Sequence, residues 1–432
     1  MNVGNTGFSA GYTNYIKLAF SPIGEPFVAF QDGYCSMQAS VMKFNGTTWV
    51  NVGDTGFSPG RAEYLSFAFS PSGEPYLAYQ DWSYSFKATV MKFNGNNWIN
   101  VGNPAFSENV AASLSLAFGP SGDPVVAFAD YADSTKISVM NFDGTNWIYM
   151  GAAGFSAGPV WYVSLAFSPS GEPHVAYQDW INDSKATVMK FDGTSWVNVG
   201  DPGFSTGQAN GTSLAFSSSG QPYVAFADFS FSGKLTVMKY NGTGWVNVGN
   251  EGCSEGFASY TSLAFSPSDQ PYVAYSDVAN SQKASVMGLN GTQWAYLGIA
   301  GFSLAQAFNT NIAFSPADGH AYVAYDDGAT AKATVMKYDS VSTDLNEKTQ
   351  SQISIFPNPV SDKLTIDFTN ISAGNTSIKI TDMRGVKIFE GQFNESKITL
   401  ITRNYPLGMY LVKLKTYNSV YFGKFCKTNN EN

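Results

Sequence analysis

The chain has 432 residues, of which 15% are aromatic and only 13% are charged. Few charges, many aromatics and 42 glycines exclude a disordered chain, a coiled coil and a collagen-like chain, and favour a β-rich protein with many turns. The net charge is −9 and the first 340 residues hold one arginine, Arg61, so a nucleic-acid partner is not expected.

A unit of 49 residues repeats along residues 1–340. Its clearest marker is a Val-Met pair whose methionine returns at this spacing; these methionines are Met42, Met91, Met140, Met189, Met238, Met287 and Met336. A tryptophan follows an Asn-Gly or Asp-Gly pair in most units, at Trp49, Trp98, Trp147, Trp196, Trp245 and Trp294. Seven copies of one unit indicate a repeat architecture.

Each unit predicts four short strands, which we call a, b, c and d. In the first unit they are expected at 18–21, 27–30, 39–44 and 49–53. The Asn-Gly or Asp-Gly pair between c and d is the strongest short hairpin signal, because both turn residues need positive φ. Four-stranded units of about 40 to 50 residues are typical of propeller blades, so residues 1–340 are predicted to form a seven-bladed β-propeller of no specific family.

The two ends of the repeat region predict how the ring closes. The seventh unit stops after strand c, and Thr343 occupies the position of its tryptophan. The chain begins Met-Asn-Val-Gly, which matches strand d residues 50–53. Residues 1–5 are therefore predicted to form the outer strand of the seventh blade.

Each strand b ends in an aspartate, and a lysine follows about six residues later in most units. These aspartates are Asp32, Asp81, Asp130, Asp179, Asp228, Asp277 and, displaced by one residue, Asp327. An aspartate kept in every unit favours a structural role, either in an ion pair with the lysine or in an Asx turn that starts the next loop. A carboxylate ring that binds cations or a repeated polar ligand is the alternative interpretation.

Loops a–b and c–d are expected at one end of each blade and hardly vary, whereas loops b–c and d–a share the other end and differ between units. The variable loops carry aromatic residues that suit stacking on sugar rings or anchoring of a protein partner. The candidate ligand-binding residues are Trp82, Tyr131, Trp161, Trp180 and Phe229. Filling of the loop interiors is their alternative role.

The sequence contains no catalytic motif that we can assign. Arg61 alone cannot supply the arginine cluster that propeller sialidases use, and no carboxylate pair stands apart from the repeated set. No catalytic residue, cofactor or metal ligand is therefore assigned. The prediction is a non-catalytic binding module for a glycan or a protein. A carbohydrate-active enzyme with carboxylates in an axial pocket and a passive surface or adhesion module are the alternatives.

The composition changes after a polar stretch at 341–352, which is predicted to be a linker. Four motifs then follow in order: Pro357-Asn358-Pro359, Asp382 to Gly385, Gly408 with Tyr410, and Lys424 to Lys427. Together they resemble the C-terminal sorting domain of the type IX secretion system of Bacteroidetes-type bacteria, over residues 353–428. Alternating strands and turns predict a small antiparallel β-sandwich for residues 353–432.

The resemblance implies export by the type IX secretion machinery, which would be a partner, and then release or attachment to the outer surface. Such proteins also carry an N-terminal signal peptide, and none precedes the repeats. We therefore expect that the natural chain extends further upstream. No run of about 18 apolar residues is present, so a transmembrane helix is not expected.

Overall fold

The computed structural model describes most of the chain; the described residues are 1–338, 354–368, 376–382, 386–415 and 420–428. The chain forms two compact units, Met1–Asp339 and Ser340–Asn432. The predicted linker at 341–352 and Thr343 lie outside the described residues. Within those residues, no helix has the length and apolar character needed to cross a membrane.

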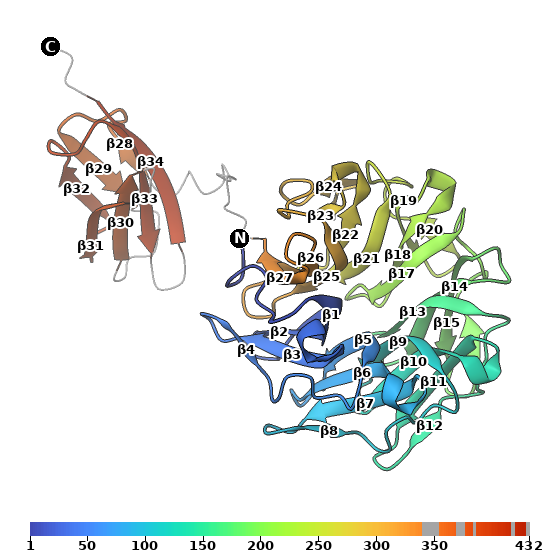
Figure 1. Ribbon diagram of the computed structural model, residues 1–432. Helices are drawn as coiled ribbons and strands as arrows, with labels where there is room; N and C mark the ends of the chain where they lie inside the picture. The colour runs from blue at the N-terminus through green and yellow to red at the C-terminus, as the bar shows by residue number, and fades with distance from the viewer. Residues whose placement is uncertain (339–353, 369–375, 383–385, 416–419, 429–432) are drawn as a thin grey trace. The chain divides into compact units, whose positions relative to one another are not determined.

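The first unit consists of seven antiparallel sheets, one for each sequence repeat (Figure 1). The a strands are β1 (Thr13–Phe20), β5 (Ala62–Phe69), β9 (Ala111–Phe118), β13 (Val160–Phe167), β17 (Ala209–Phe216), β21 (Ala258–Phe265) and β25 (Ala307–Phe314). The b strands are β2 (Pro26–Asp32), β6 (Pro75–Asp81), β10 (Pro124–Asp130), β14 (Pro173–Asp179), β18 (Pro222–Asp228), β22 (Pro271–Asp277) and β26 (Ala321–Asp327).

The outer half of each sheet is built from the two remaining strands. The c strands are β3 (Gln38–Phe44), β7 (Lys87–Phe93), β11 (Lys136–Phe142), β15 (Lys185–Phe191), β19 (Lys234–Tyr240), β23 (Lys283–Asn290) and β27 (Lys332–Lys337). The d strands are β4 (Trp49–Asn51), β8 (Trp98–Asn100), β12 (Trp147–Tyr149), β16 (Trp196–Asn198), β20 (Trp245–Asn247) and β24 (Gln293–Tyr296). Short 3₁₀ turns in the b–c loops are η1 (Gly33–Cys35), η2 (Trp82–Tyr84), η3 (Tyr131–Asp133), η4 (Phe229–Phe231) and η5 (Val278–Asn280).

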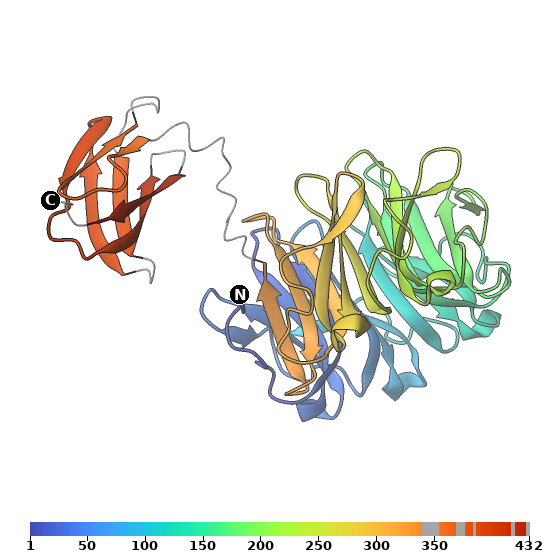
Figure 2. The ribbon, with the colours of Figure 1, turned by 90° about the horizontal axis from the view of Figure 1, so that it is seen from above.

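The sheets, which we number as blades one to seven in chain order, pack side by side in a closed ring, which Figure 1 shows face-on and Figure 2 after a turn of 90°. Each a strand contacts the a strand of the next blade, and β25 contacts β1. Strand b is almost wholly buried, because neighbouring blades cover both of its faces. The core therefore lies in layers between blades, as in the cluster that joins Val41 of blade one to Leu77 of blade two.

Tryptophan clasps join successive blades at the outer edge. The indole N–H of Trp98 donates a 2.7 Å hydrogen bond to the carbonyl oxygen of Val52 in the preceding repeat. The same ring stacks on Phe57 with 4.2 Å between centroids. The other five tryptophans make the same bond to the residue 46 positions earlier, so they are packing residues of the scaffold.

The N-terminal segment closes the ring. The backbone N–H of Val3 donates to the carbonyl oxygen of Val335 at 2.9 Å, the same bond that Val52 makes to Val41 within blade one. Asn2 pairs with Met336 as an antiparallel bridge. Trp49 clasps Val3, so the start of the chain serves as the outer strand of blade seven, as the repeat alignment predicted.

The second unit packs two small antiparallel sheets around one core. The sheets contain β28 (Ser354–Phe356), β29 (Lys363–Asp367) and β32 (Lys397–Ile401), and β31 (Lys387–Phe393), β30 (Thr376–Asp382), β33 (Gly408–Lys415) and β34 (Val420–Lys427). Leu364, Ile380 and Phe425 are buried between them. The predicted fold class, a seven-bladed β-propeller followed by a small antiparallel β-sandwich, is confirmed.

The motifs at the two ends of the sandwich sequence meet in space. The Asn358 side chain, between Pro357 and Pro359, donates to the carbonyl oxygen of Lys424 at 3.3 Å and accepts from the amide of Cys426 at 2.9 Å. The buried Lys427 ammonium donates to the carbonyl oxygens of Ser361 and Thr428. The first motif therefore holds the last strand in place.

The two middle motifs stabilise turns. Asp382 accepts a 2.9 Å hydrogen bond from the amide of Val386, and the Tyr410 hydroxyl donates to the carbonyl oxygen of Pro406 at 2.6 Å. Gly408 has a φ of +143° at the start of β33, in a region that favours glycine. Gly385 lies outside the described residues.

Candidate functional site

The two ends of the blades differ in the same way as the loop sequences. Because strands a to d are antiparallel neighbours in each sheet, loops b–c and d–a emerge on one side of the ring, which we call the variable face. Loops a–b and c–d emerge on the opposite side, the scaffold face.

An arc of exposed aromatic side chains lies on the variable face. Its members, which we call the aromatic arc, directly follow the aspartate of strand b in blades two to five; they are Trp82, Tyr131, Trp180 and Phe229. Their exposed fractions run from 41% for Trp82 to 61% for Trp180. The equivalent residues in blades one and seven are Gly33 and Gly328, so the arc covers one side of the ring and leaves the other open.

Contacts within the loops fix part of the arc. The Arg61 guanidinium lies 4.2 Å from the centre of the Trp82 ring, and Phe229 meets Phe257 edge to face at 5.7 Å. Trp161, the fifth candidate, was expected in a variable d–a loop, but it lies on the a strand β13, paired with Gln178, and is 36% exposed. All five candidate residues therefore present exposed aromatic surface on the same face.

The seven aspartates at the ends of the b strands hold their own loops. In blade two, Asp81 accepts from the amide of Ser83 at 3.0 Å and from the hydroxyl of Thr89 at 3.2 Å. Asp32, Asp130, Asp228 and Asp327 accept from the amide two residues ahead in the same way. Asp179 and Asp277 accept from a hydroxyl and from an asparagine side chain.

These bonds follow an Asx-turn geometry in five blades and a side-chain variant of it in two. Within the described residues, no ion pair joins these aspartates to the lysines opposite them, such as Lys87 opposite Asp81. Burial raises the pKa of Asp81, Asp130 and Asp228 above the ordinary value. Each of these carboxylates thus stabilises the b–c loop of its own blade.

A β-bulge near the start of every a strand places one residue in the left-handed region of backbone conformation. These bulge residues are Tyr15, Tyr64, Ser113, Tyr162, Gly211, Tyr260 and Asn309. A bulky residue there is strained by about 1 kcal/mol or more. Tyr15 and Tyr64 pack against each other with 5.5 Å between ring centres, so the inner rim of the variable face is also aromatic.

A cavity of about 410 Å³ opens on the variable face, lined by residues of blades six, seven and one. We call it the seam cavity, and its principal lining residues are Tyr12, Asn14, Tyr260, Phe308, Asn309 and Asp326. Tyr260 and Phe308 stand nearly perpendicular, with an interplanar angle of 88° and 6.4 Å between centroids. Part of its wall is therefore aromatic, and its polar side chains include the amides of Asn14 and Asn309, the Thr13 hydroxyl and two acids, Asp326 and Asp327.

One of these acids, Asp326, is buried and held by two hydrogen bonds. Thr13 donates its hydroxyl proton to one carboxylate oxygen at 2.5 Å, and the Asn309 amide donates to the other at 2.7 Å. Burial raises the pKa of Asp326 to about 6, against the opposing effect of these bonds. Lys17, on the same a strand as Thr13, interacts electrostatically with Asp326, and desolvation lowers the pKa of its ammonium group.

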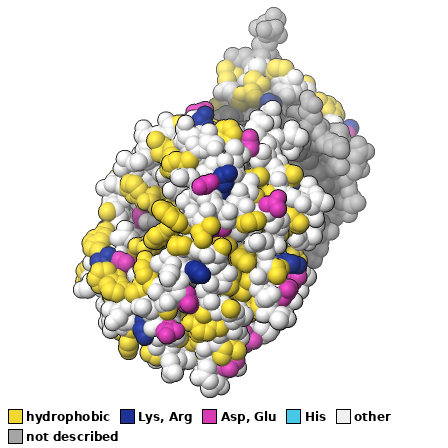
Figure 3. Space-filling model, turned by 90° about the vertical axis from the view of Figure 1, so that its right-hand side faces the viewer, with side chains coloured by type: hydrophobic (Ala, Val, Ile, Leu, Met, Phe, Trp, Pro, Cys, Tyr) yellow, Lys and Arg dark blue, Asp and Glu magenta, His cyan; other side chains and the backbone are white. Residues whose placement is uncertain are grey.

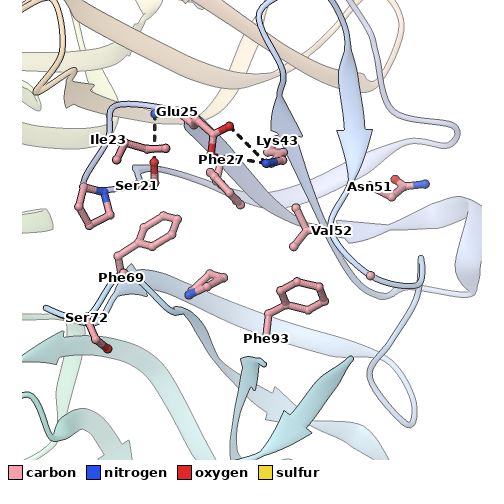
Figure 4. A pocket seen from close by; sticks show the side chains of 14 residues that line it. Ser21, Ile23, Glu25, Phe27, Lys43, Asn51, Val52, Phe69, Ser72 and Phe93 are labelled. Atoms are coloured by element: carbon pink, nitrogen blue, oxygen red, sulfur yellow. Dashed lines mark hydrogen bonds and ion pairs between the residues drawn. The ribbon is translucent and has the colours of Figure 1, made fainter. Parts of the chain in front are cut away.

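A second cavity, of about 440 Å³, lies on the scaffold face between blades one and two (Figure 4). Its walls include Phe27, Phe69 and Phe93, and the ion pair between Lys43 and Glu25 closes one side at 3.2 Å. The same ion pair recurs in other blades, for example between Lys92 and Glu74. The ion pair at the edge of this groove is therefore a repeated feature of the scaffold face.

The surface carries few charges. Figure 3 shows one side of the propeller, on which Lys, Arg, Asp and Glu side chains are sparse and hydrophobic groups are scattered between uncharged polar atoms. This distribution follows from the composition, in which 13% of residues are charged. Contacts with a ligand on such a surface depend on stacking and hydrogen bonds.

Sequence reasoning missed the seam cavity. The seventh repeat contains one extra residue before strand b, which drew attention to Asp327, the structural counterpart of Asp277. Asp326 was not predicted as a site residue, although every other blade has an uncharged residue at its position. Once that extra residue is left out, aligning the seven repeats shows Asp326 as the single acid at its position.

Fold and sequence together define a class: a secreted β-propeller with a C-terminal sorting domain. Residues 354–428 match the family model described as the secretion system C-terminal sorting domain. The second unit therefore contains a sorting domain of the type IX secretion system, which indicates export to the cell surface or beyond.

Particular relatives cover parts of the chain. An endo-acting ulvan lyase of Formosa agariphila is 33% identical over 82 residues, which is 19% of this chain and 16% of that protein. PorZ, a surface component of the type IX secretion system of Porphyromonas gingivalis, has a solved structure that matches 98% of this chain and 60% of its own, with 14% identity and a TM-score of 0.52. The chain thus spans less than two thirds of the length of either protein.

A further solved structure, an ulvan lyase of polysaccharide lyase family PL25 with a bound saccharide, matches 77% of this chain and 95% of its own. Its identity is 10% and its TM-score 0.51. Structural likeness at 10 to 14% identity establishes the fold of the propeller.

Proposed function

We propose that this chain is a non-catalytic glycan-binding propeller that acts at the cell surface or in the medium after export. The observation that carries the proposal is the aromatic arc, in which Trp82, Tyr131, Trp180 and Phe229 expose their rings at equivalent positions of four successive blades. Exposed aromatic rings on a rigid frame stack on the apolar faces of sugar rings.

The regular placement of the arc supports an extended ligand. Four equivalent positions on neighbouring blades give repeated weak contacts, and linked weak contacts raise overall affinity by about 10²- to 10⁴-fold over a single one. The open sector at Gly33 and Gly328 makes the contacts unequal. A polysaccharide that crosses the face from one side fits this arrangement better than seven identical small ligands.

The test is binding of the full chain to an array of plant, algal and host glycans, followed by isothermal titration calorimetry on the best ligands. The Trp82→Ala/Trp180→Ala double variant should lose at least tenfold in affinity, because each ring contributes about 1 kcal/mol or more of stacking. Its melting temperature should stay near that of the parent, since both side chains are on exposed loops.

The matched control is Ile99→Ala/Ile148→Ala, which removes exposed apolar side chains from the outer d strands β8 and β12 instead. This control should bind as the parent does. An array with no specific binding to the parent chain would exclude the glycan proposal and favour a protein ligand or a passive surface role.

A carbohydrate-active enzyme is the second candidate, and Asp326 is the observation that favours it. A buried carboxyl with a pKa raised to about 6 has the character of a general acid. Its neighbour Asp327 is bound to the amide of Ala329 in the b–c loop, and alternation along β26 directs the two side chains to opposite faces of the sheet. Both acids nevertheless line the seam cavity, and the Asp327 carboxylate is the one already held by its own loop.

The two candidates are separated by an activity assay. Parent chain and Asp326→Asn are incubated with each polysaccharide that the array identifies, and the release of new chain ends is followed over a day. Cleavage by the parent and loss in Asp326→Asn would establish the enzyme. Binding without cleavage is the expected result.

A further inference from the structure

Each position of the propeller can be compared across the seven repeats. At the junction between blades seven and one, three residues differ in type from their counterparts in the other repeats. At the position of Asp326 the other blades carry Gln, Ala or Ser; at the position of Thr13 they carry Ala or Val; and at the position of Lys17 they carry Ser or Asn. All three exceptions lie at one junction.

Ring closure does not require these exceptions. In blade one, the Gln31 amide donates a 2.7 Å hydrogen bond to the carbonyl oxygen of Ala62 in blade two, and Gln80 makes the same bond to Ala111. A neutral clasp is therefore available for joining neighbouring blades. Asp326 cannot donate such a bond when ionised, and its burial carries a desolvation cost that glutamine avoids.

Lys17 also cannot make the inter-blade hydrogen bond that the serines at its position in other blades make. The Ser66 hydroxyl accepts from the amide of Leu116 in the next blade at 2.8 Å, and Ser115, Ser164 and Ser213 repeat this contact. A lysine ammonium has no acceptor, so blade one lacks the equivalent bond. Blade one thus lacks the serine contact and blade seven lacks the glutamine clasp of blades one and two, and a charged group stands at each of the two positions.

The cavity itself has the chemistry of a sugar site. The Asp326 carboxylate has about four acceptor positions, two of which are used by Thr13 and Asn309. Asp326 lines the cavity together with Tyr260, Phe308 and Asn14. Fixed acceptors and amides beside an aromatic wall match the hydroxyl edge and the apolar face of a pyranose.

We propose that the seam cavity is a distinct subsite that receives one residue of an uncharged glycan, with Asp326 accepting hydrogen bonds from its hydroxyl groups and Tyr260 or Phe308 stacking on its ring. The inference rests on the proposed glycan-binding function and specifies its ligand class. Ionised Asp326 and an acidic propeller disfavour uronic acids and sulfated sugars, since a buried carboxylate repels another anion.

The test is calorimetric titration of the full chain at pH 7.5 with neutral hexasaccharides of glucose, mannose, xylose and arabinose, and with hexagalacturonate as the acidic comparison. At least one neutral hexasaccharide should bind at least tenfold more tightly than hexagalacturonate. Asp326→Asn should weaken that binding at least tenfold, because the amide replaces one acceptor by a donor.

Tyr260→Gly separates binding from stability. Gly211 occupies the same bulge in blade five, so glycine relieves the left-handed strain of Tyr260 while it removes the aromatic wall. The variant should lose at least tenfold in affinity with no fall in melting temperature. Asp123→Asn, an exposed acid of the scaffold face, is the matched control for the loss of a carboxylate and should bind as the parent does.

The outcomes distinguish this inference from the proposed function. If Trp82→Ala/Trp180→Ala abolishes binding and the seam variants bind as the parent does, the aromatic arc is the site and the seam inference is wrong. Preferential binding of hexagalacturonate would overturn the ligand class. If no oligosaccharide binds the parent, both the glycan-binding function and the seam subsite are rejected.

Discussion

Single residues of the repeat have measurable structural duties, and the tryptophan clasp is the clearest. Trp98 is buried, stacks on Phe57 and bonds Val52 of the neighbouring repeat. Trp98→Ala should lower the free energy of unfolding by about 3 to 5 kcal/mol, through the lost burial and the cavity left behind. Trp98→Phe keeps an aromatic ring and should lose about 1 to 2 kcal/mol. Urea denaturation measures both, and a Trp98→Phe variant as stable as the parent would show that the hydrogen bond has no separate role.

Asp326 predicts an unusual pH dependence. Its pKa is raised from 3.8 to about 6 in the folded chain, so the unfolded chain releases this proton at lower pH than the folded chain does. Folding stability due to this group therefore falls as pH rises from about 4 to about 6, by about 2 to 3 kcal/mol in total. Asp326→Asn cannot ionise, so its stability relative to the parent should rise over the same window.

This difference is measured by chemical denaturation of parent and variant at half-unit steps between pH 4 and pH 8. Taking the difference removes the contribution of the other carboxyl groups, which are common to both proteins. A constant difference across the range would contradict a raised pKa for Asp326.

At the scale of strands, closure of the ring depends on the first residues of the chain. Deletion of residues 1–5 removes the partner of β27 and the acceptor of the Trp49 indole. We expect a sharp fall in melting temperature, because an open sheet edge and an unsatisfied buried donor are both costly. Asn5→Ser, which keeps the backbone bonds, is the control. Equal melting temperatures for the deletion and the parent would contradict this closure.

In the sandwich, Asn358 links the first motif to the last strand. Asn358→Ala removes its bonds to Lys424 and Cys426, and the amide of Cys426 should then exchange its hydrogen faster. Hydrogen exchange with mass spectrometry tests this on the full chain. Asn394→Ala, at an exposed position outside the motifs, should leave the exchange of β34 unchanged. Unchanged exchange in Asn358→Ala would exclude the clasp.

At the scale of the whole molecule, the low charge content predicts binding that depends little on salt. Surface charges are sparse, and the proposed contacts are stacking and neutral hydrogen bonds. Affinity for a neutral glycan should change less than threefold between about 50 and 500 mM NaCl, because these contacts are barely screened. A fall of tenfold or more, measured by calorimetry, would indicate an electrostatic ligand site instead.

The architecture could be predicted from the sequence because the same pattern of turns and apolar stretches occurs seven times. The Asn-Gly turns, the tryptophans and the four apolar stretches agree with one another, and the match between 1–4 and 50–53 predicted the closing strand. The sorting motifs were found because their spacing is local. Structural features that depend on repeated or local sequence patterns can therefore be predicted without a structure.

The seam cavity could not be predicted for the opposite reason. Its lining combines Tyr12 and Asn14 with Phe308 and Asp326, which come from opposite ends of the repeat region. These residues come together only when the ring closes. The strained bulges at Tyr15 and Tyr260 were also missed, because the local sequence carries no glycine to mark them. The aromatic arc was proposed from the loops alone, and its ligand role stays a prediction.

Closure by the first residues has a consequence for how the chain acquires its structure. The bonds between Met1 and Lys337 join residues 336 positions apart, so they form only after nearly the whole propeller has been synthesised. Until β27 has been made, residues 1–5 lack their pairing partner, and the unfinished ring presents open edges that invite pairing with other chains. Contacts of such long range also slow folding. Ring closure is therefore expected to be the last and slowest step of maturation, and the step at which a chaperone has most to protect.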